Sequence, residues 1–264
     1  MTPDPPRLLV IQHEDDAPPG LLRRWFDAAG VDLDVLLSHR GQDIPVALTE
    51  HDGLIVLGGA MGALDDDVAP WLPAVRSLIA GTVGAGLPFL GICLGHQLGG
   101  AALGGTVQRN PAGQAGGVTP WLPTPAGLAD PLLGGIRDGA PCVQWNGDIV
   151  VELPPGATVL ARSPDGAVQA VRYGEHAWGV QPHPEVTPAI FCSWTTDKPS
   201  AGAPRPDGID IRAVAQEIED RGAELAREWE PFGRRFAQIV TGLRPSGPRG
   251  FDAPAASGSR IPPG

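Results

Sequence analysis

The stretch PFLGICLGHQLGGAAL, residues 88–103, contains a strand pattern that changes directly into a helix pattern. With Leu87 directly before it, the run Leu87 to Ile92 is short and apolar, which is typical of a buried strand. From Leu98 to Leu103 the apolar residues follow at helical spacing. A strand that leads straight into a helix is the repeating unit of parallel α/β sheets, so this stretch predicts an α/β fold.

Cys93 lies at the junction itself, between Gly91 and Gly95. Small residues two positions before and after a side chain permit the sharp strand-to-helix turn that presents a nucleophile, which here is a thiol. The helix N-terminus favours a thiolate, and its N–H groups, starting with that of Leu94, can stabilise an oxyanion. Taken alone, the pattern is equally typical of a buried structural cysteine.

Short apolar runs recur on both sides of this junction. Upstream they predict strands over 8–11, 31–37 and 54–57 and helices over 20–29 and 68–83. Downstream they predict short, turn-bounded strands over 106–108, 118–122, 142–145, 158–162, 168–172 and 178–181. We therefore expect an α/β fold with a three-layer, flavodoxin-like, mostly parallel sheet flanked by helices. A small additional β region in the second half and C-terminal helices complete the expected fold.

The composition changes near residue 199. Residues 1–198 are expected to form one α/β domain, and 199–208 (PSAGAPRPDG) a linker. Residues 209–242 carry apolar side chains at spacings of three, four and seven, which predicts a helical extension that packs on the domain and is broken at Pro231. Residues 243–264 are rich in Pro, Gly and Ser, so a disordered tail is expected.

The net charge and the cysteine content argue against several kinds of partner and site. The 264 residues include 19 Lys and Arg against 30 Asp and Glu, a formal net charge of −11. This balance disfavours nucleic acid and anionic membranes as partners. Cys93, Cys142 and Cys192 are too few and too widely spaced for a disulfide framework or a Cys-x-x-Cys metal pair. Because neither a secretory signal nor a transmembrane run is found, the expected compartment is the cytoplasm.

A second candidate piece is QPHPE, residues 181–185, in which His183 and Glu185 are two positions apart. Pro184 favours an extended backbone between them, and in an extended segment such positions point to the same side. Glu185 can therefore hold His183 in one tautomer while the other ring nitrogen faces a thiol. A lone histidine is more often structural, but together with Cys93 the pair favours nucleophilic catalysis.

A third piece is Gly58-Gly59, which ends the apolar run at 53–57. Backbone N–H groups at such a turn can face an anion without obstruction from side chains. A flexible loop after a strand would give the same sequence pattern. A nucleotide-binding P-loop is excluded, because no Gly-Lys-Ser/Thr follows.

GICLGHQ (residues 91–97), together with Gly58-Gly59 upstream and HPE (183–185) downstream, resembles the class I glutamine amidotransferase family, whose active site is a Cys-His-Glu triad. Within that family the likeness is greatest to stand-alone relatives of the glutaminase domain of GMP synthase. It extends from about residue 8 to residue 240 and includes DDD (65–67), QWNGD (144–148) and WGVQ (178–181).

The resemblance implies a mechanism in which Cys93 attacks the side-chain amide of glutamine. His183 would shuttle protons and Glu185 would orient it, and water would then hydrolyse the γ-glutamyl thioester. This chemistry requires no metal and no cofactor, and none is expected.

The resemblance also implies an oxyanion and substrate-binding set of Gly58, Gly59, Leu94 and Gln97. The backbone N–H groups of Gly59 and Leu94 would stabilise the oxyanion, and Gln97 would contact the bound glutamine. His96 is expected to be structural, and Cys142 and Cys192 are interpreted as core or incidental residues.

Four positions depart from the family pattern. Asn146 replaces a His, Pro182 replaces a Phe, Gln114 replaces a Glu and Ala60 replaces a Pro. By analogy these positions lie near the substrate pocket, so the γ-glutamyl donor or the acceptor can differ from that of relatives.

The leading hypothesis is a glutaminase that delivers ammonia to a separate synthetase. The chain has no Ser-Gly-Gly-x-Asp-Ser loop and no length for a synthetase domain, so the acceptor is expected to be another protein. One alternative is a γ-glutamyl hydrolase or peptidase, which uses the same thioester on γ-glutamyl compounds. A second alternative is a non-catalytic binding or regulatory module with the same fold.

Overall fold

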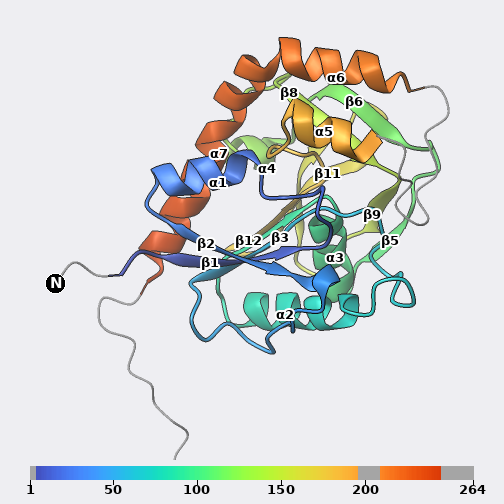
Figure 1. Cartoon of the computed structure of the whole chain (residues 1–264). Coiled ribbons are helices and arrows are strands. Elements are labelled where there is room, and N and C mark those ends of the chain that lie inside the picture. Colours follow the sequence, from blue (N-terminus) through green and yellow to red (C-terminus); the bar gives the residue numbers. More distant parts are fainter. Residues whose placement is uncertain (1–3, 196–208, 245–264) are drawn as a thin grey trace, which may run out of the picture.

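The middle layer of the molecule is an eight-stranded sheet (Figure 1). The structure is a computed structural model that describes residues 4–195 and 209–244. The expected linker at 199–208 and nearly all of the expected tail therefore lie outside the described residues. The strands of the sheet are β1 (Arg7–Gln12), β2 (Asp32–Leu37), β3 (Gly53–Val56), β4 (Phe89–Ile92), β7 (Leu122–Pro123), β10 (Thr158–Arg162), β11 (Val168–Gly174) and β12 (Ala177–Val180).

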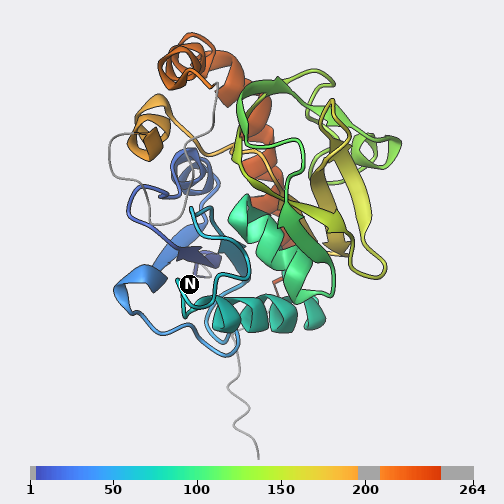
Figure 2. The same cartoon turned by 90° about the vertical axis from the view of Figure 1, so that its right-hand side faces the viewer.

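Their order across the sheet is β2-β1-β3-β4-β12-β11-β10-β7. The first five strands are parallel to their neighbours, and β11, β10 and β7 continue the sheet in antiparallel pairing. Figure 2 shows this β-rich second half, in green and yellow, beside the parallel part in blue. The expected three-layer, mostly parallel α/β fold is confirmed.

Helices cover both faces of the sheet (Figure 1). They are α1 (Leu21–Ala28), η1 (Ser38–Arg40), α2 (Leu72–Gly84), α3 (Leu94–Ala102), α4 (Pro125–Leu128), α5 (Pro188–Thr195), α6 (Ile211–Asp220) and α7 (Gly222–Gly242). The second helix begins at Leu72 rather than at the expected Val68, because Pro70 disfavours helical backbone at the residue before it. Within the described ranges, no helix is both long and apolar enough to span a membrane.

Alternate residues of β1 enter two separate cores. Leu8 and Val10 pack in the cluster that includes residues of α1 and α7, whereas Leu9 and Ile11 pack in the cluster that includes α2 and α3. Side chains in a strand alternate between the two faces, so a strand that is apolar at every position must be covered on both sides. This is why the uninterrupted apolar runs predict central strands.

The second half of the chain adds two small sheets. One pairs β5 (Thr106–Arg109) with β9 (Asp148–Glu152), and the other pairs β6 (Ala115–Pro120) with β8 (Pro141–Asn146). The single strand expected over 118–122 is in fact divided between β6 and β7. The division falls at Trp121, which is 1% exposed and packs edge-on against Trp229 at 5.2 Å between ring centroids.

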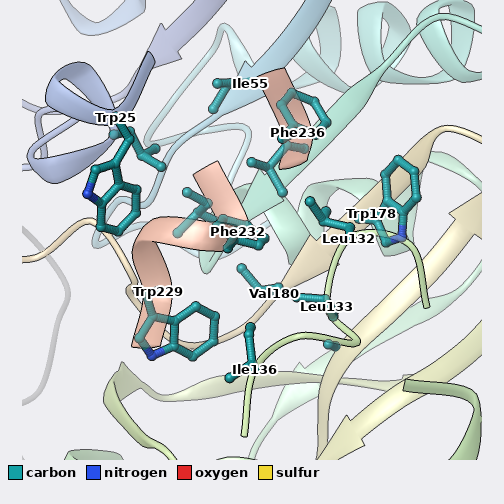
Figure 3. Packing of buried hydrophobic residues seen from close by; sticks show 14 of the residues in the cluster. Trp25, Ile55, Leu132, Leu133, Ile136, Trp178, Val180, Trp229, Phe232 and Phe236 are labelled. Carbon is teal, nitrogen blue, oxygen red and sulfur yellow. The ribbon is translucent and has the colours of Figure 1, made fainter. Parts of the chain in front are cut away.

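The expected helix break at Pro231 is wrong. α7 continues through Pro231, and the chain instead breaks at Arg221, between α6 and α7. A proline inside a helix costs about 3 kcal/mol or more, because a hydrogen bond is lost and the ring clashes with the preceding turn. Figure 3 shows why the helix survives: Trp229, Phe232 and Phe236 project from it into the core, and their burial offsets this cost.

Replacing Phe232 by alanine should lower the free energy of unfolding by about 3–5 kcal/mol, because a fully buried ring is lost and a cavity remains. Urea unfolding followed by circular dichroism measures this change. The control is Leu243→Ala at the end of α7, where the side chain is 42% exposed and the expected change is within about 0.5 kcal/mol. Equal losses in the two variants would contradict a core role for α7.

Candidate active site

Four neighbouring parallel strands bring the candidate residues to one edge of the sheet. β1, β3, β4 and β12 lie side by side, and all four end at this edge. The segments that follow them carry Glu14, Gly58-Gly59, Cys93 and His183. In open α/β sheets, ligands bind at the carboxyl ends of the strands, so this edge is the candidate site.

Cys93 occupies a strained turn between β4 and α3. Its φ of 50° is the only positive value of any non-glycine residue in the part of the chain that the structure describes. A Cβ atom on Gly91 would overlap the backbone oxygen of Gly95, and one on Gly95 would overlap that of Val56. The two glycines therefore allow the turn, as the sequence pattern predicts. The Cys93 N–H donates to the Val180 carbonyl at 2.8 Å, which ties the turn to β12.

His183 and Glu185 are in direct contact. Nδ1 of His183 and Oε1 of Glu185 are 2.8 Å apart, and the two residues are only 5% and 3% exposed. The geometric reason differs from the expected one, because β12 ends at Val180 and Pro184-Glu185 form a turn rather than an extended segment. The contact leaves Nε2 as the ring nitrogen available to another group.

The backbone of this segment is fixed from two sides. The His183 N–H donates to the Val143 carbonyl of β8 at 2.8 Å. The Leu21 N–H, at the start of α1, donates to the Glu185 carbonyl at 2.9 Å. Gly20 precedes it with φ 51°, and a Cβ there would overlap the same Glu185 oxygen. Only glycine fits at this close approach.

Gly58 marks the place where His183 and Cys93 meet. An added Cβ at Gly58 would lie 3.1 Å from Cε1 of His183 and 3.7 Å from Cβ of Cys93, so both side chains border this glycine. Burial lowers the pKa of His183, but the charges of Cys93 and Glu185 and hydrogen bonds to both outweigh burial and raise it. The protonated imidazole is thus stabilised by an acidic partner on each side.

The Gly59 loop lies beside the start of α3. An added Cβ at Gly59 would come within 3.0 Å of a Leu94 methyl group. Leu94 is the first residue of α3, so its N–H has no acceptor within the helix and is free to face an anion. The next residue of the loop, Ala60, donates its N–H to the carboxylate of Glu14 at 3.2 Å. Burial and the charge of Asp16 raise the pKa of Glu14 to about 7.

Gln181 is a residue of the site to which the sequence analysis gives no role. It is fully buried, and its Nε2 donates toward Sγ of Cys93 at 3.5 Å. Its Oε1 accepts from Nε2 of Gln97 at 3.3 Å, and the same nitrogen also donates to the Asp148 carbonyl at 2.9 Å. Gln181 therefore links the thiol to Gln97. Gln181 directly follows β12, and the other candidate residues also follow the ends of parallel strands. This position is the sequence signal that could have identified Gln181 as a residue of the site.

Three of the four departures from the family pattern lie close to this link or to the histidine. Asn146 donates to the Asp148 carbonyl that Gln97 also contacts, at 3.1 Å. A Cβ at Gly147 would lie 2.9 Å from Oε1 of Gln114, so Gln114 borders the same turn. Pro182 is buried directly before the histidine, and Ala60 is exposed at the end of the Gly59 loop.

Other candidate side chains lie elsewhere. Nδ1 of His96 is 2.8 Å from the hydroxyl of Tyr173, and burial lowers the pKa of His96 to about 3. Cys142 is buried in β8, where burial raises its pKa to about 11, and Cys192 is exposed on α5. Among the described residues, no group of three or more His, Cys, Asp or Glu side chains could hold a metal ion.

The described arrangement places a thiol, a buried imidazole–carboxylate pair and free backbone N–H groups within one small region. Together these groups can perform nucleophilic acyl transfer: the thiol attacks, the imidazole transfers the proton and the N–H groups stabilise the oxyanion.

The model of the family described as glutamine amidotransferase class-I matches residues 20–192, which is more than half of the chain. The chain belongs to this family. Members are generally cysteine-dependent amidohydrolases, and Gly58-Gly59, Cys93, His183 and Glu185 lie within the matched residues. The recognition made from the sequence motifs is therefore confirmed.

Similar proteins give a more detailed comparison. The chain is 32% identical over 241 residues to the glutamine amidotransferase-like protein YfeJ of Salmonella typhimurium, covering 90% of this chain and 89% of that one. It is 32% identical to gamma-glutamyl peptidase 5 of Arabidopsis thaliana, covering 73% and 72%. It is also 32% identical to a GMP synthase of Thermosynechococcus vestitus, over 59% of this chain but only 27% of that protein. A glutamine amidotransferase structure from Methylobacillus flagellatus superposes with a TM-score of 0.78 at 26% identity, covering 94% and 98%.

Gly95→Ala should lower the free energy of unfolding by about 1–3 kcal/mol, because its methyl group meets the rigid backbone of Val56. The matched control is Gly81→Ala in α2, where an added Cβ meets nothing within 4 Å. That variant should be more stable by about 0.5–1 kcal/mol, because alanine is the better helix former. Thermal unfolding compares the two, and changes of the same sign would contradict the packing described for the Cys93 turn.

His96 should make stability depend on pH below its ordinary pKa of 6.5. The folded state binds its proton only near pH 3, whereas the unfolded chain binds it below 6.5, so the contribution is complete above pH 6.5 and is lost as the pH falls. His96→Gln should therefore reduce the slope of stability against pH between about 4 and 6 by ~1.4 kcal/mol per pH unit.

Urea unfolding at several pH values measures this slope. The matched control is Tyr173→Phe, which removes the hydroxyl beside His96 but keeps the buried imidazole, so the wild-type slope should remain. A wild-type slope in His96→Gln would mean that His96 titrates normally in the folded protein.

Proposed function

We propose that this protein hydrolyses the side-chain amide of glutamine through a cysteinyl γ-glutamyl thioester and delivers the ammonia to a separate partner. The observation that carries the proposal is the meeting of Cys93 with the His183–Glu185 pair beside Gly58. Membership of the amidotransferase family supports the choice of an amide as the substrate bond.

In the first half of the reaction, Sγ of Cys93 attacks the amide carbon while Nε2 of His183 takes the thiol proton. The N–H groups of Gly59 and Leu94 are proposed to stabilise the oxyanion, and one such donor contributes roughly 2.7–4 kcal/mol to lowering a barrier. His183 then protonates the leaving nitrogen, so ammonia departs and the γ-glutamyl thioester remains. Glu185 holds the ring through Nδ1 and stabilises the positive charge that it gains.

In the second half, water attacks the thioester carbon and His183 accepts one of its protons. The carbon–sulfur bond breaks, glutamate leaves, and the proton returns to Sγ. Gln97 and Gln181 are proposed to border the bound substrate next to Cys93. Their side-chain amides connect Sγ to the turn at Asp148 through a chain of hydrogen bonds. The protein ends the cycle unchanged.

The ammonia acceptor is proposed to be a different protein. The likeness to GMP synthase of Thermosynechococcus vestitus covers only 27% of that protein, whereas YfeJ is matched over 89% of its length. The match to YfeJ over nearly its whole length supports this proposal, and identifying the synthetases that copurify with this chain is the direct way to find the acceptor.

A second candidate function is a γ-glutamyl peptidase or hydrolase. It is supported by the similarity to gamma-glutamyl peptidase 5 and by Asn146 and Gln114, which differ from the family pattern and border the turn at Asp148. Rates with glutamine and with a γ-glutamyl dipeptide distinguish the two. A clear preference for the dipeptide would favour the peptidase and contradict glutamine as the main substrate.

Cys93→Ala should reduce glutamine hydrolysis by at least about a thousandfold, because removal of a nucleophile leaves only binding and oxyanion stabilisation. The loss of rate in Glu185→Ala should be about a hundredfold smaller than the loss in Cys93→Ala, since an orienting residue supplies only part of the effect. Cys192→Ala, at the exposed cysteine of α5, is the control and should keep its activity. Released ammonia and glutamate are measured.

Labelling provides an independent check. A chloroketone analogue of glutamine should alkylate Cys93 of the wild-type protein in a ratio of one per chain, as determined by peptide mass. If the folded protein takes up no label and shows no hydrolysis, the remaining interpretation is a non-catalytic binding or regulatory module. Near-normal hydrolysis by Cys93→Ala would instead show that the nucleophile is another group.

A further inference from the structure

The ring of Trp194 lies against the imidazole of His183. Their centroids are 4.6 Å apart, and their planes are inclined by 53°. Trp194 comes from α5, which packs beside α6 and close to the start of α1 (Figure 2). We propose that Trp194 is a positioning residue, which holds the His183 imidazole in the orientation that faces Cys93. The inference rests on the proposed function of His183 as the proton carrier.

Trp194 is itself fixed in two ways. Its indole N–H donates to the Asp16 carbonyl, in the loop between β1 and α1, at 2.8 Å. Its ring also contacts Phe191, with centroids 6.0 Å apart, and Phe191 packs edge-on against Trp145 at 5.4 Å. A side chain that is held by a hydrogen bond and by neighbouring rings can serve as a rigid wall.

His183 requires a second steric restraint, because its hydrogen bond to Glu185 restrains the ring only at Nδ1. Small changes of the two side-chain torsions of His183, followed by the Glu185 carboxylate, would move Nε2 away from Cys93 while the Nδ1–Oε1 contact is kept. Gly58 borders the ring on the side of Cε1, and Trp194 lies against the ring at a second place. A misplacement of about 1 Å can cost a catalytic step as much as a hundredfold, so restraint of the ring has a direct consequence for rate.

The indole also suits the charge that His183 carries. The pKa of His183 is raised, so the positive charge that its ring gains with the thiol proton is stabilised at this place. An aromatic face near a cation is favourable, and most of all where water is excluded, as at this 5% exposed histidine. Trp194 therefore contributes more than its volume, and an aliphatic side chain of similar size cannot replace it.

The test compares Trp194→Leu and Trp194→Met, which lack an aromatic ring, with Trp194→Phe, which keeps a ring but loses the hydrogen bond to Asp16. The matched control is Ile190→Ala, which weakens the packing of the same helix but keeps the Trp194 ring against His183. The first readout is the rate at which iodoacetamide alkylates Cys93 at pH 7, resolved by peptide mass. This reaction needs no glutamine, so it remains informative even where the proposed substrate is wrong.

In Trp194→Leu and in Trp194→Met, iodoacetamide should alkylate Cys93 about tenfold more slowly than in the wild type. The reason is that a displaced imidazole no longer takes the thiol proton. The alkylation rate of Cys93 in Trp194→Phe should stay within about threefold of the wild-type rate, and the rate in Ile190→Ala should equal the wild-type rate. With glutamine, the two aliphatic variants should lose kcat by about tenfold while KM changes by less than about twofold.

Folding is checked by circular dichroism and thermal unfolding, and two aliphatic replacements ensure that one folded variant is available for measurement. The proposal is overturned when a folded Trp194→Leu or Trp194→Met alkylates Cys93 as fast as Ile190→Ala does. It is also overturned when Trp194→Phe is as slow as the aliphatic variants, because the ring would then have no role of its own. If the alkylation rates differ among the variants as expected but the wild type does not hydrolyse glutamine, the proposed substrate is contradicted and the role of Trp194 is supported.

Discussion

The site depends on the parallel pairing of β4 with β12. This pairing sets Ile92 opposite Val180, so the residues that follow the two strands begin side by side although they are almost ninety positions apart. The hydrogen bond from the Cys93 N–H to the Val180 carbonyl extends the ladder by one step and fixes the strained turn. Without this register, neither Gln181 nor His183 would reach the thiol, and the remaining motifs would have nothing to act on.

The loop between β1 and α1 connects the pieces that surround the thiol. Glu14 holds the Gly59 loop through Ala60, the Asp16 carbonyl holds Trp194, and the start of α1 holds the carbonyl of Glu185. The first two contacts use different parts of the loop and the third uses Leu21, the first residue of α1, and each partner comes from a distant part of the chain. A catalytic group is positioned well only when the residues behind it are fixed as well, and this one loop supplies much of that support.

The parts that the sequence predicts are those governed by local rules. Gly91, Cys93 and Gly95 predict the turn because steric limits on backbone angles act within a few residues, and the apolar runs predict the central strands for the same reason. The contact of His183 with Glu185 was also expected, although a turn brings it about rather than an extended segment. Tertiary contacts decide the rest. Gln181 and Trp194 gain their places from neighbours far along the chain, and the cost of Pro231 is offset by core burial that no local pattern reveals.

The position of α7 has a consequence for the order in which the molecule can be completed. All of the proposed catalytic side chains are synthesised by residue 185, but α7, which covers a large part of one sheet face, comes only at residues 222–242. Until this helix has left the ribosome, it cannot cover the apolar side chains of Leu90, Ile92 and Val180. The core behind the catalytic strands is therefore complete only once a segment that contributes no residue to the proposed chemistry has been added.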